Sequence, residues 1–129
     1  MQPWEIANHW HWILPLLEKI PDSVAKPQDA KYALENRLAQ CWGFIDSDKD
    51  VPHGVVITRL GRIGETPSGL IWMASGEPLE AFVELLRSHI EPWMREAGCK
   101  VIEINGRRGW KRVLADYSER TTTFAKELL

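Results

Sequence analysis

Four cations and a tryptophan lie close together in the stretch EINGRRGWKRVL, residues 103–114. The cations are Arg107, Arg108, Lys111 and Arg112. They fall where a strand is expected to lead into a helix. Cations at the start of a helix face the positive end of its dipole, so a negative partner would stabilise them. That partner is either internal (Glu103, Asp116 or Glu119), an acidic protein surface, or nucleic-acid phosphate.

A nucleic-acid partner would be held mainly through the phosphates. Four contacts of this kind give a modest affinity that falls with salt and carries no base specificity. Trp110 could stack on a base, or it could pack on the sheet. The whole chain has 16 Lys and Arg against 18 Asp and Glu, a net charge of -2, so no overall basic field supports the local cluster.

Other residues capable of chemistry are scattered. His9 and His11 are two apart, and on a helix they point about 200° from each other, so they are not expected to share a metal. Glu103 is either a general base on its strand or the partner of a neighbouring cation. Cys41 and Cys99 show no CxxC spacing and are predicted to be reduced core residues, with a disulfide as the alternative. We therefore assign no catalytic and no metal-binding residue.

Length and hydropathy limit the class of protein. A chain of 129 residues with 44% hydrophobic content suits a single domain, residues 1–129. No window approaches the roughly 18 apolar residues of a membrane span. The expectation is a cytoplasmic protein without a membrane partner.

The hydrophobic pattern predicts nine elements. They are a helix over 4–20 that is kinked or broken at Pro15, a helix over 28–40, strands over 41–46, 54–61 and 69–75, a helix over 77–98, a strand over 100–105, a helix over 107–117 and a strand over 121–128. The strand–helix–strand order makes strands 69–75 and 100–105 parallel neighbours. The predicted class is α+β, with a mixed central sheet that contains a three-strand antiparallel meander, a βαβ unit and flanking helices.

This order of elements, with the stretch GCKVIEINGRRGWKRVLADY at 98–117, resembles the GNAT (Gcn5-related N-acetyltransferase) fold without its usual first strand. The pattern is most similar to small GNAT-like proteins of tailed bacteriophages, where GC..IEI.GR.GW.R.L..Y recurs. Some of those proteins belong to the virion or to DNA ejection. The resemblance implies a GNAT-like domain and, as a candidate ligand, acetyl-CoA.

The resemblance also indicates where acetyl-CoA would bind. GNAT proteins hold its pyrophosphate at the start of the long helix, and many place an Asn after the fifth strand, so Gly76 and Asn105 become candidate contacts. The loop here is ASGEPLEA, in which Glu77 adds a negative charge and Pro78 removes an N–H donor. The alternative is purely structural, with Ser75 capping the helix. The tyrosine that the family often places seven residues after the Asn is replaced by Arg112.

The sequence is therefore interpreted as a catalytically degenerate GNAT-fold phage protein, without a cofactor, that acts as a virion-associated or protein-interaction component with a link to DNA ejection. Its expected partners are other phage or virion proteins, with nucleic acid a weaker candidate and a homo-oligomer left open. It would occupy the host cytoplasm or the virion. The alternative is an active N-acetyltransferase that uses acetyl-CoA.

Overall fold

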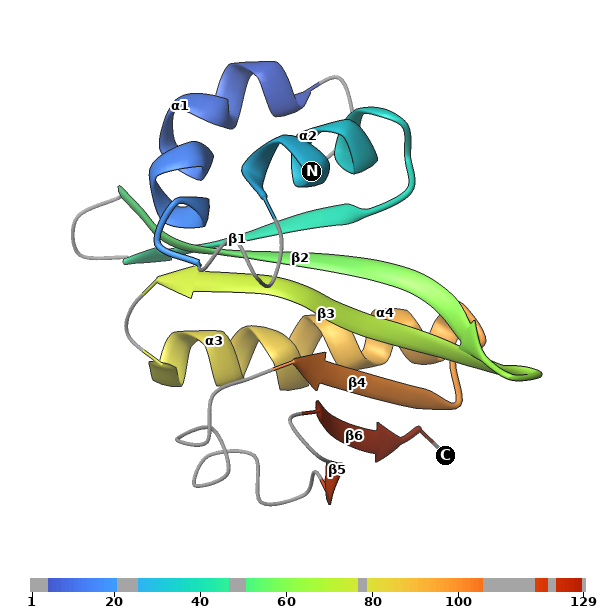
Figure 1. Ribbon diagram of the computed structural model, residues 1–129. Helices are drawn as coiled ribbons and strands as arrows, with labels where there is room; N and C mark the ends of the chain where they lie inside the picture. Colours follow the sequence, from blue (N-terminus) through green and yellow to red (C-terminus); the bar gives the residue numbers. More distant parts are fainter. Residues whose placement is uncertain are drawn as a thin grey trace.

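The computed structural model describes residues 5–20, 26–46, 51–76, 79–105, 118–120 and 123–128. In chain order the elements are α1 (Ile6–Leu17), α2 (Pro27–Glu35), β1 (Gln40–Asp46), β2 (Val51–Ile63), β3 (Thr66–Gly76), α3 (Leu79–Leu85), the π-helical segment η2 (Leu86–Ile90), α4 (Glu91–Glu96), β4 (Val101–Asn105), β5 (Ser118–Arg120) and β6 (Thr123–Glu127) (Figure 1).

One mixed sheet joins all six strands in the order β1-β2-β3-β4-β6-β5. β1, β2 and β3 form the antiparallel meander. β3 also pairs in parallel with β4, and the long helix formed by α3, η2 and α4 connects these two strands. β6 then pairs antiparallel with both β4 and β5. The predicted fold class, the meander and the βαβ unit are confirmed. The short strand β5 was not predicted, and the predicted helix over 107–117 lies outside the described residues.

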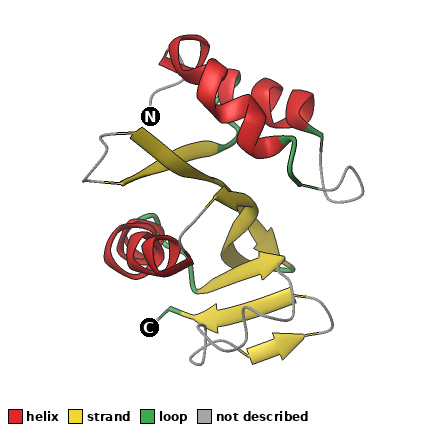
Figure 2. Ribbon diagram, turned by 90° about the vertical axis from the view of Figure 1, so that its left-hand side faces the viewer, coloured by secondary structure: helices red, strands yellow, loops and turns green. Residues whose placement is uncertain are grey.

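The helices cover the two faces of the sheet (Figure 2). α3, η2 and α4 lie on one face, which we call the α3 face; its core includes Phe82, Leu86, Ile90 and Met94 against Ile71. α1 and α2 lie on the other face, the α1 face, over the end of the sheet that holds β1 and β2. Alternation along each strand sends successive side chains to the two faces, so the face of each strand residue follows from its cluster.

The long helix differs from the continuous helix predicted over 77–98. It contains the π-helical turn η2, in which the Glu91 N–H bonds the carbonyl of Leu86, five residues back. Pro92 follows immediately and has no N–H to donate to the residue four positions before it. The wider turn accommodates that missing donor and keeps Leu86 and Ile90 both buried.

The first two helices also differ from the predicted bounds. α1 is one helix that continues through Pro15 to Leu17, because Ile13 and Leu17 are both fully buried against the sheet. α2 stops at Glu35 rather than continuing to residue 40, since Arg37 adopts a left-handed backbone with φ of 60°. Within the ranges that the structure describes, no helix is long and apolar enough to cross a membrane.

Candidate functional site

β3 contains a bulge near its middle. Ile57 of β2 pairs with Met73, whereas the next residue, Thr58, pairs with Ile71, so Trp72 has no partner opposite it. Trp72 and Met73 consequently both face the α1 side, where they join the same cluster. A bulge bends its strand and increases the local twist, which redirects β3 at this residue.

The parallel ladder between β3 and β4 ends at the same place. Its four pairs run from Ser68 with Val101 to Ile71 with Ile104. β3 then continues through Trp72 to Gly76 without a β4 partner in the described ladder. Successive backbone groups of a strand point to alternate edges, so this edge of β3 carries N–H and C=O groups that β4 does not occupy. The edge is about 16 Å long at the usual rise per residue. We call it the β3 edge.

Asn105 and Gly76 lie near the two ends of the β3 edge. Asn105 is the last residue of β4 and pairs with Thr123, one position beyond the end of the β3–β4 ladder. Gly76 closes β3 opposite Gly54. The two predicted contacts therefore lie at opposite ends of the β3 edge. We refer to the space along this edge, beyond the last β3–β4 pair, as the gap between β3 and β4.

Gly76 also has a packing role. Its φ is +125°, and a Cβ placed there would lie 2.2 Å from the carbonyl oxygen of His53. A glycine is therefore needed for the close approach of β2, whether or not a phosphate binds nearby. Ser75, which was expected to cap the helix, is instead a strand residue paired with Val55, while Glu77 and Pro78 lie outside the described residues.

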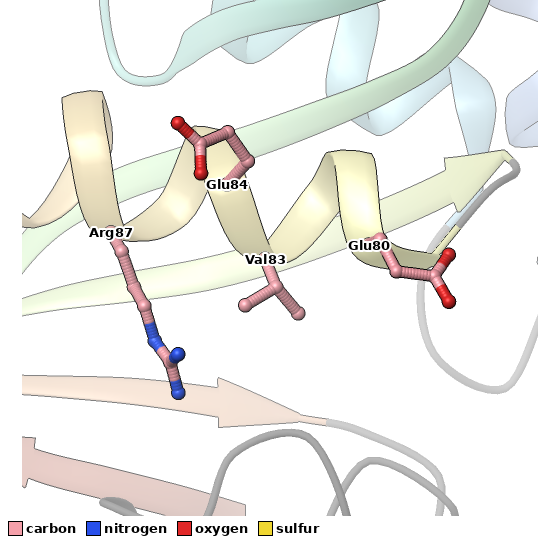
Figure 3. A pocket seen from close by; sticks show the side chains of 4 residues that line it. All are labelled: Glu80, Val83, Glu84 and Arg87. Atoms are coloured by element: carbon pink, nitrogen blue, oxygen red, sulfur yellow. The ribbon is translucent and has the colours of Figure 1, made fainter.

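A hollow of about 270 Å³ lies along α3 and the start of η2 (Figure 3). Its described lining consists of Glu80, Val83, Glu84 and Arg87. In this view Val83 and Arg87 point from the helix toward the side of β4, and Glu84 points the opposite way. Two carboxylates against one guanidinium make a poor site for a pyrophosphate, whose charge they repel.

The remaining candidates have structural explanations or fall elsewhere. Trp12 donates its Nε1–H to His9 Nδ1 at 3.0 Å, and His11 is exposed, as expected for histidines on different faces of a helix. In the described part of the chain, no group of three or more His, Cys, Asp or Glu side chains is arranged to hold a metal. The basic cluster, Arg107, Arg108, Lys111 and Arg112, lies outside the described residues.

Both cysteines are core residues, as predicted. Cys41 lies in the core of the α1 face and Cys99 in that of the α3 face, and both are free thiols. Burial raises the pKa of Cys41 from 9.0 to about 12 and also raises the pKa of Cys99. A thiol that stays protonated is a weak nucleophile, so neither side chain is suited to covalent catalysis.

The bulge at Trp72 was not predicted from the sequence, whereas the acyltransferase alternative already placed acetyl-CoA between strands 69–75 and 100–105. The signal available was the run Leu70–Ala74, in which five consecutive apolar residues interrupt strict alternation. Such a run is equally typical of a strand buried on both faces, so it does not identify a bulge.

Comparisons with solved structures identify proteins that share the fold of this chain. No family model and no curated protein sequence matches the chain. Among solved structures, a GNAT family acetyltransferase from Brucella melitensis in complex with acetyl-CoA matches with a TM-score of 0.67 at 14% identity, covering 100% of this chain and 85% of that one. Tetrahymena GCN5 matches with a TM-score of 0.55 at 9% identity over 98% of this chain and 86% of its own.

An acetyltransferase from Trypanosoma brucei is also similar, with a TM-score of 0.56 at 14% identity over 94% of this chain and 92% of that chain. Identities this low carry information about the fold alone. They support the GNAT part of the resemblance seen in the sequence and do not bear on a bacteriophage origin. The chain thus has the fold of the GNAT acetyltransferases.

Proposed function

We propose that the protein is an N-acyltransferase that binds acetyl-CoA in the gap between β3 and β4. The observation that carries this proposal is the end of the β3–β4 ladder at Ile71 and Ile104, next to the bulge at Trp72, beyond which β3 continues to Gly76. The similarity to a GNAT family acetyltransferase in complex with acetyl-CoA, over the whole of this chain, supports it.

The residues around the gap fit the amide-containing arm of acetyl-CoA. The N–H and C=O groups of the β3 edge, which the described residues of β4 leave unpaired, would bond the two amides of the pantetheine arm much as a further strand would. Asn105, at the end of β4, would lie beside the reacting end of that arm. When bound, acetyl-CoA would supply the acetyl thioester from which an acceptor amine takes its acyl group.

The start of the long helix fits the nucleotide end less well. Glu80 and Glu84 are exposed on the first turns of α3, and Glu77 and Pro78 precede them in the sequence. The glutamate carboxylates would repel a pyrophosphate, and Pro78 lacks a backbone N–H group that could donate to it. In this proposal binding energy comes mainly from the β3 edge, and the affinity for acetyl-CoA is moderate.

The second candidate is the catalytically degenerate interaction component inferred from the sequence. It is favoured by the packing role of Gly76, which explains that glycine without a phosphate. In that case the basic cluster at 107–112 would contact a virion protein or, less strongly, nucleic acid. The fold comparisons favour the acyltransferase.

Calorimetric titration with acetyl-CoA separates the two candidates. If the protein is an acyltransferase, we expect micromolar binding of acetyl-CoA. Asn105→Ala should weaken this binding about tenfold, because it removes one or two hydrogen bonds. Asn36→Ala is the matched control, because Asn36 is exposed and, among the described residues, its side chain bonds only the Tyr32 carbonyl at the end of α2. Absence of binding at millimolar acetyl-CoA would reject the acyltransferase and leave the interaction component.

A further inference from the structure

We infer that the acceptor of the proposed acyltransferase is an amino-carboxylate, held between Glu103 and Arg59 on the α1 face of the sheet. That this ligand accepts an acetyl group rests on the proposed function, but its binding site can be tested without acetyl-CoA. It concerns a row of three residues across three neighbouring strands: Arg59 of β2, Leu70 of β3 and Glu103 of β4.

These three side chains share one face. Arg59 pairs with Leu70, and Leu70 pairs with Glu103, so they stand side by side across the sheet. Ile102 and Ile104, on either side of Glu103, are buried in the core of the α3 face, which places Glu103 on the α1 face. The Arg59 guanidinium lies 4.7 Å from the ring of Trp72, a residue of the cluster on that same face.

Both charged side chains are half-buried and have no counter-ion among the described residues. Neither Arg59 nor Glu103 makes a hydrogen bond or ion pair with the part of the chain that the structure describes. Their Cα atoms are separated by two strand spacings, about 9.6 Å, with Leu70 between them. Half-buried charges are stabilised by an opposite charge, and two of opposite sign in one row are complementary to a ligand that carries both.

The position of the row relative to the gap gives the ligand an orientation. Glu103 lies one residue before the end of the β3–β4 ladder, next to the proposed site of the thioester, while Arg59 lies two strands away. The amine of the ligand would bind at Glu103 and its carboxylate at Arg59. The separation suits an ω-amino acid or a short peptide, whose charges are several bonds apart, and Leu70 would contact the hydrocarbon between them.

The chemistry follows from this orientation. The ammonium first gives one proton to the Glu103 carboxylate, which frees the lone pair of the amine. The amine nitrogen then forms the new C–N bond with the acetyl carbonyl carbon as the C–S bond of the thioester breaks. The second proton that the nitrogen loses passes to the leaving thiolate, which becomes the free thiol of coenzyme A. Glu103 is therefore a candidate catalytic residue, and Arg59 a specificity residue.

The test is calorimetric titration of the protein, without acetyl-CoA, by 6-aminohexanoate and by its neutral amide, 6-aminohexanamide. The inference predicts that the wild type binds the carboxylate about tenfold more tightly than the amide, as one charge-assisted contact allows. Arg59→Gln should abolish that preference and Arg59→Lys should retain part of it. Glu103→Gln should weaken both ligands about tenfold.

Arg62→Gln and Glu127→Gln are the matched controls, because both residues are exposed and Arg62 bonds only the Glu65 carbonyl in the hairpin turn. Failure of the wild type to bind either probe at millimolar concentration, equal binding of the two probes, or the same losses in the controls would each overturn the inference. If the protein binds acetyl-CoA but does not prefer 6-aminohexanoate to its amide, the proposed function stands and the amino-carboxylate acceptor is rejected. If it shows that preference but does not bind acetyl-CoA, the amino-carboxylate site stands and the acyltransferase function is rejected.

Discussion

Lys126 of β6 places its Nζ 2.8 Å from Oε1 of Glu91, at the start of α4. The Glu91 side chain is 5% exposed and that of Lys126 27% exposed, so the pair lies at the edge of the core of the α3 face. The ion pair links α4 to β6. Because β6 is the neighbour of β4 in the sheet, this ion pair adds to the apolar packing that holds the long helix against that part of the sheet.

Lys126→Met should lower the free energy of unfolding by about 2–3 kcal/mol, because it removes the ammonium group 2.8 Å from the buried Glu91 carboxylate. Urea denaturation measures this loss. The double variant Glu91→Leu with Lys126→Met should lose clearly less than Lys126→Met alone, since no uncompensated charge remains. Equal losses in the single and double variants would show that the pair does not act as a unit.

Thr58 of β2 hydrogen-bonds two side chains of β1. Its Oγ1 accepts the Nε1–H of Trp42 at 3.0 Å and donates to Gln40 Oε1 at 3.0 Å, and its side chain is fully buried. Thr58→Val removes both bonds at nearly constant volume and should cost about 1–3 kcal/mol in urea denaturation. Thr66→Val, at an exposed strand position, is the matched control and should change stability by less than about 0.5 kcal/mol.

Gly76→Ala tests the packing role of that glycine. A Cβ would lie 2.2 Å from the His53 carbonyl oxygen on a backbone with φ of +125°, so we expect a loss of about 2 kcal/mol or more in stability. Gly64→Ala is the control, because Gly64 also has a positive φ, +60°, but open space around it. If Gly76→Ala kept full stability and lost only acetyl-CoA binding, the glycine would serve the ligand instead.

Cys41 should make stability depend on pH above neutrality. Its pKa rises on folding from 9.0 to about 12 because burial disfavours the thiolate. The folded state therefore keeps a proton that the unfolded state loses, and stability falls as pH rises from about 9 toward 12. Relative to Cys41→Ala, the wild type should lose roughly 1 kcal/mol between pH 7.5 and pH 10, as measured by urea denaturation. An identical pH dependence in the two proteins would contradict this assignment.

Much of the fold could be predicted from the sequence because its elements carry strong periodic signals. The meander and the parallel pairing follow from short β-rich runs and a helical crossover, and the face of the long helix follows from residues such as Phe82 and Met94. The interruption of that helix at η2 depends on one residue, Pro92, whose effect is absorbed by packing instead of breaking the helix. The same holds at Pro15, where burial of the flanking residues overrides a local breaker.

The candidate site was only partly accessible from the sequence. Asn105 and Gly76 were selected through a resemblance, and the structure places both at ends of the β3 edge. The row formed by Arg59 and Glu103 could not be recognised, because strand register across three strands brings together residues 44 positions apart in the sequence. Register depends on the bulge at Trp72, which periodicity does not reveal.

Amide hydrogen exchange with and without acetyl-CoA tests the central claim most directly, since it reports on the backbone of the β3 edge itself. The proposal predicts that amides within Trp72–Gly76 exchange at least about tenfold more slowly in the presence of saturating acetyl-CoA. The exposed tip of the β2–β3 hairpin, Gly61–Glu65, should be unaffected. Unchanged exchange along Trp72–Gly76 at millimolar acetyl-CoA would contradict a binding site in the gap between β3 and β4.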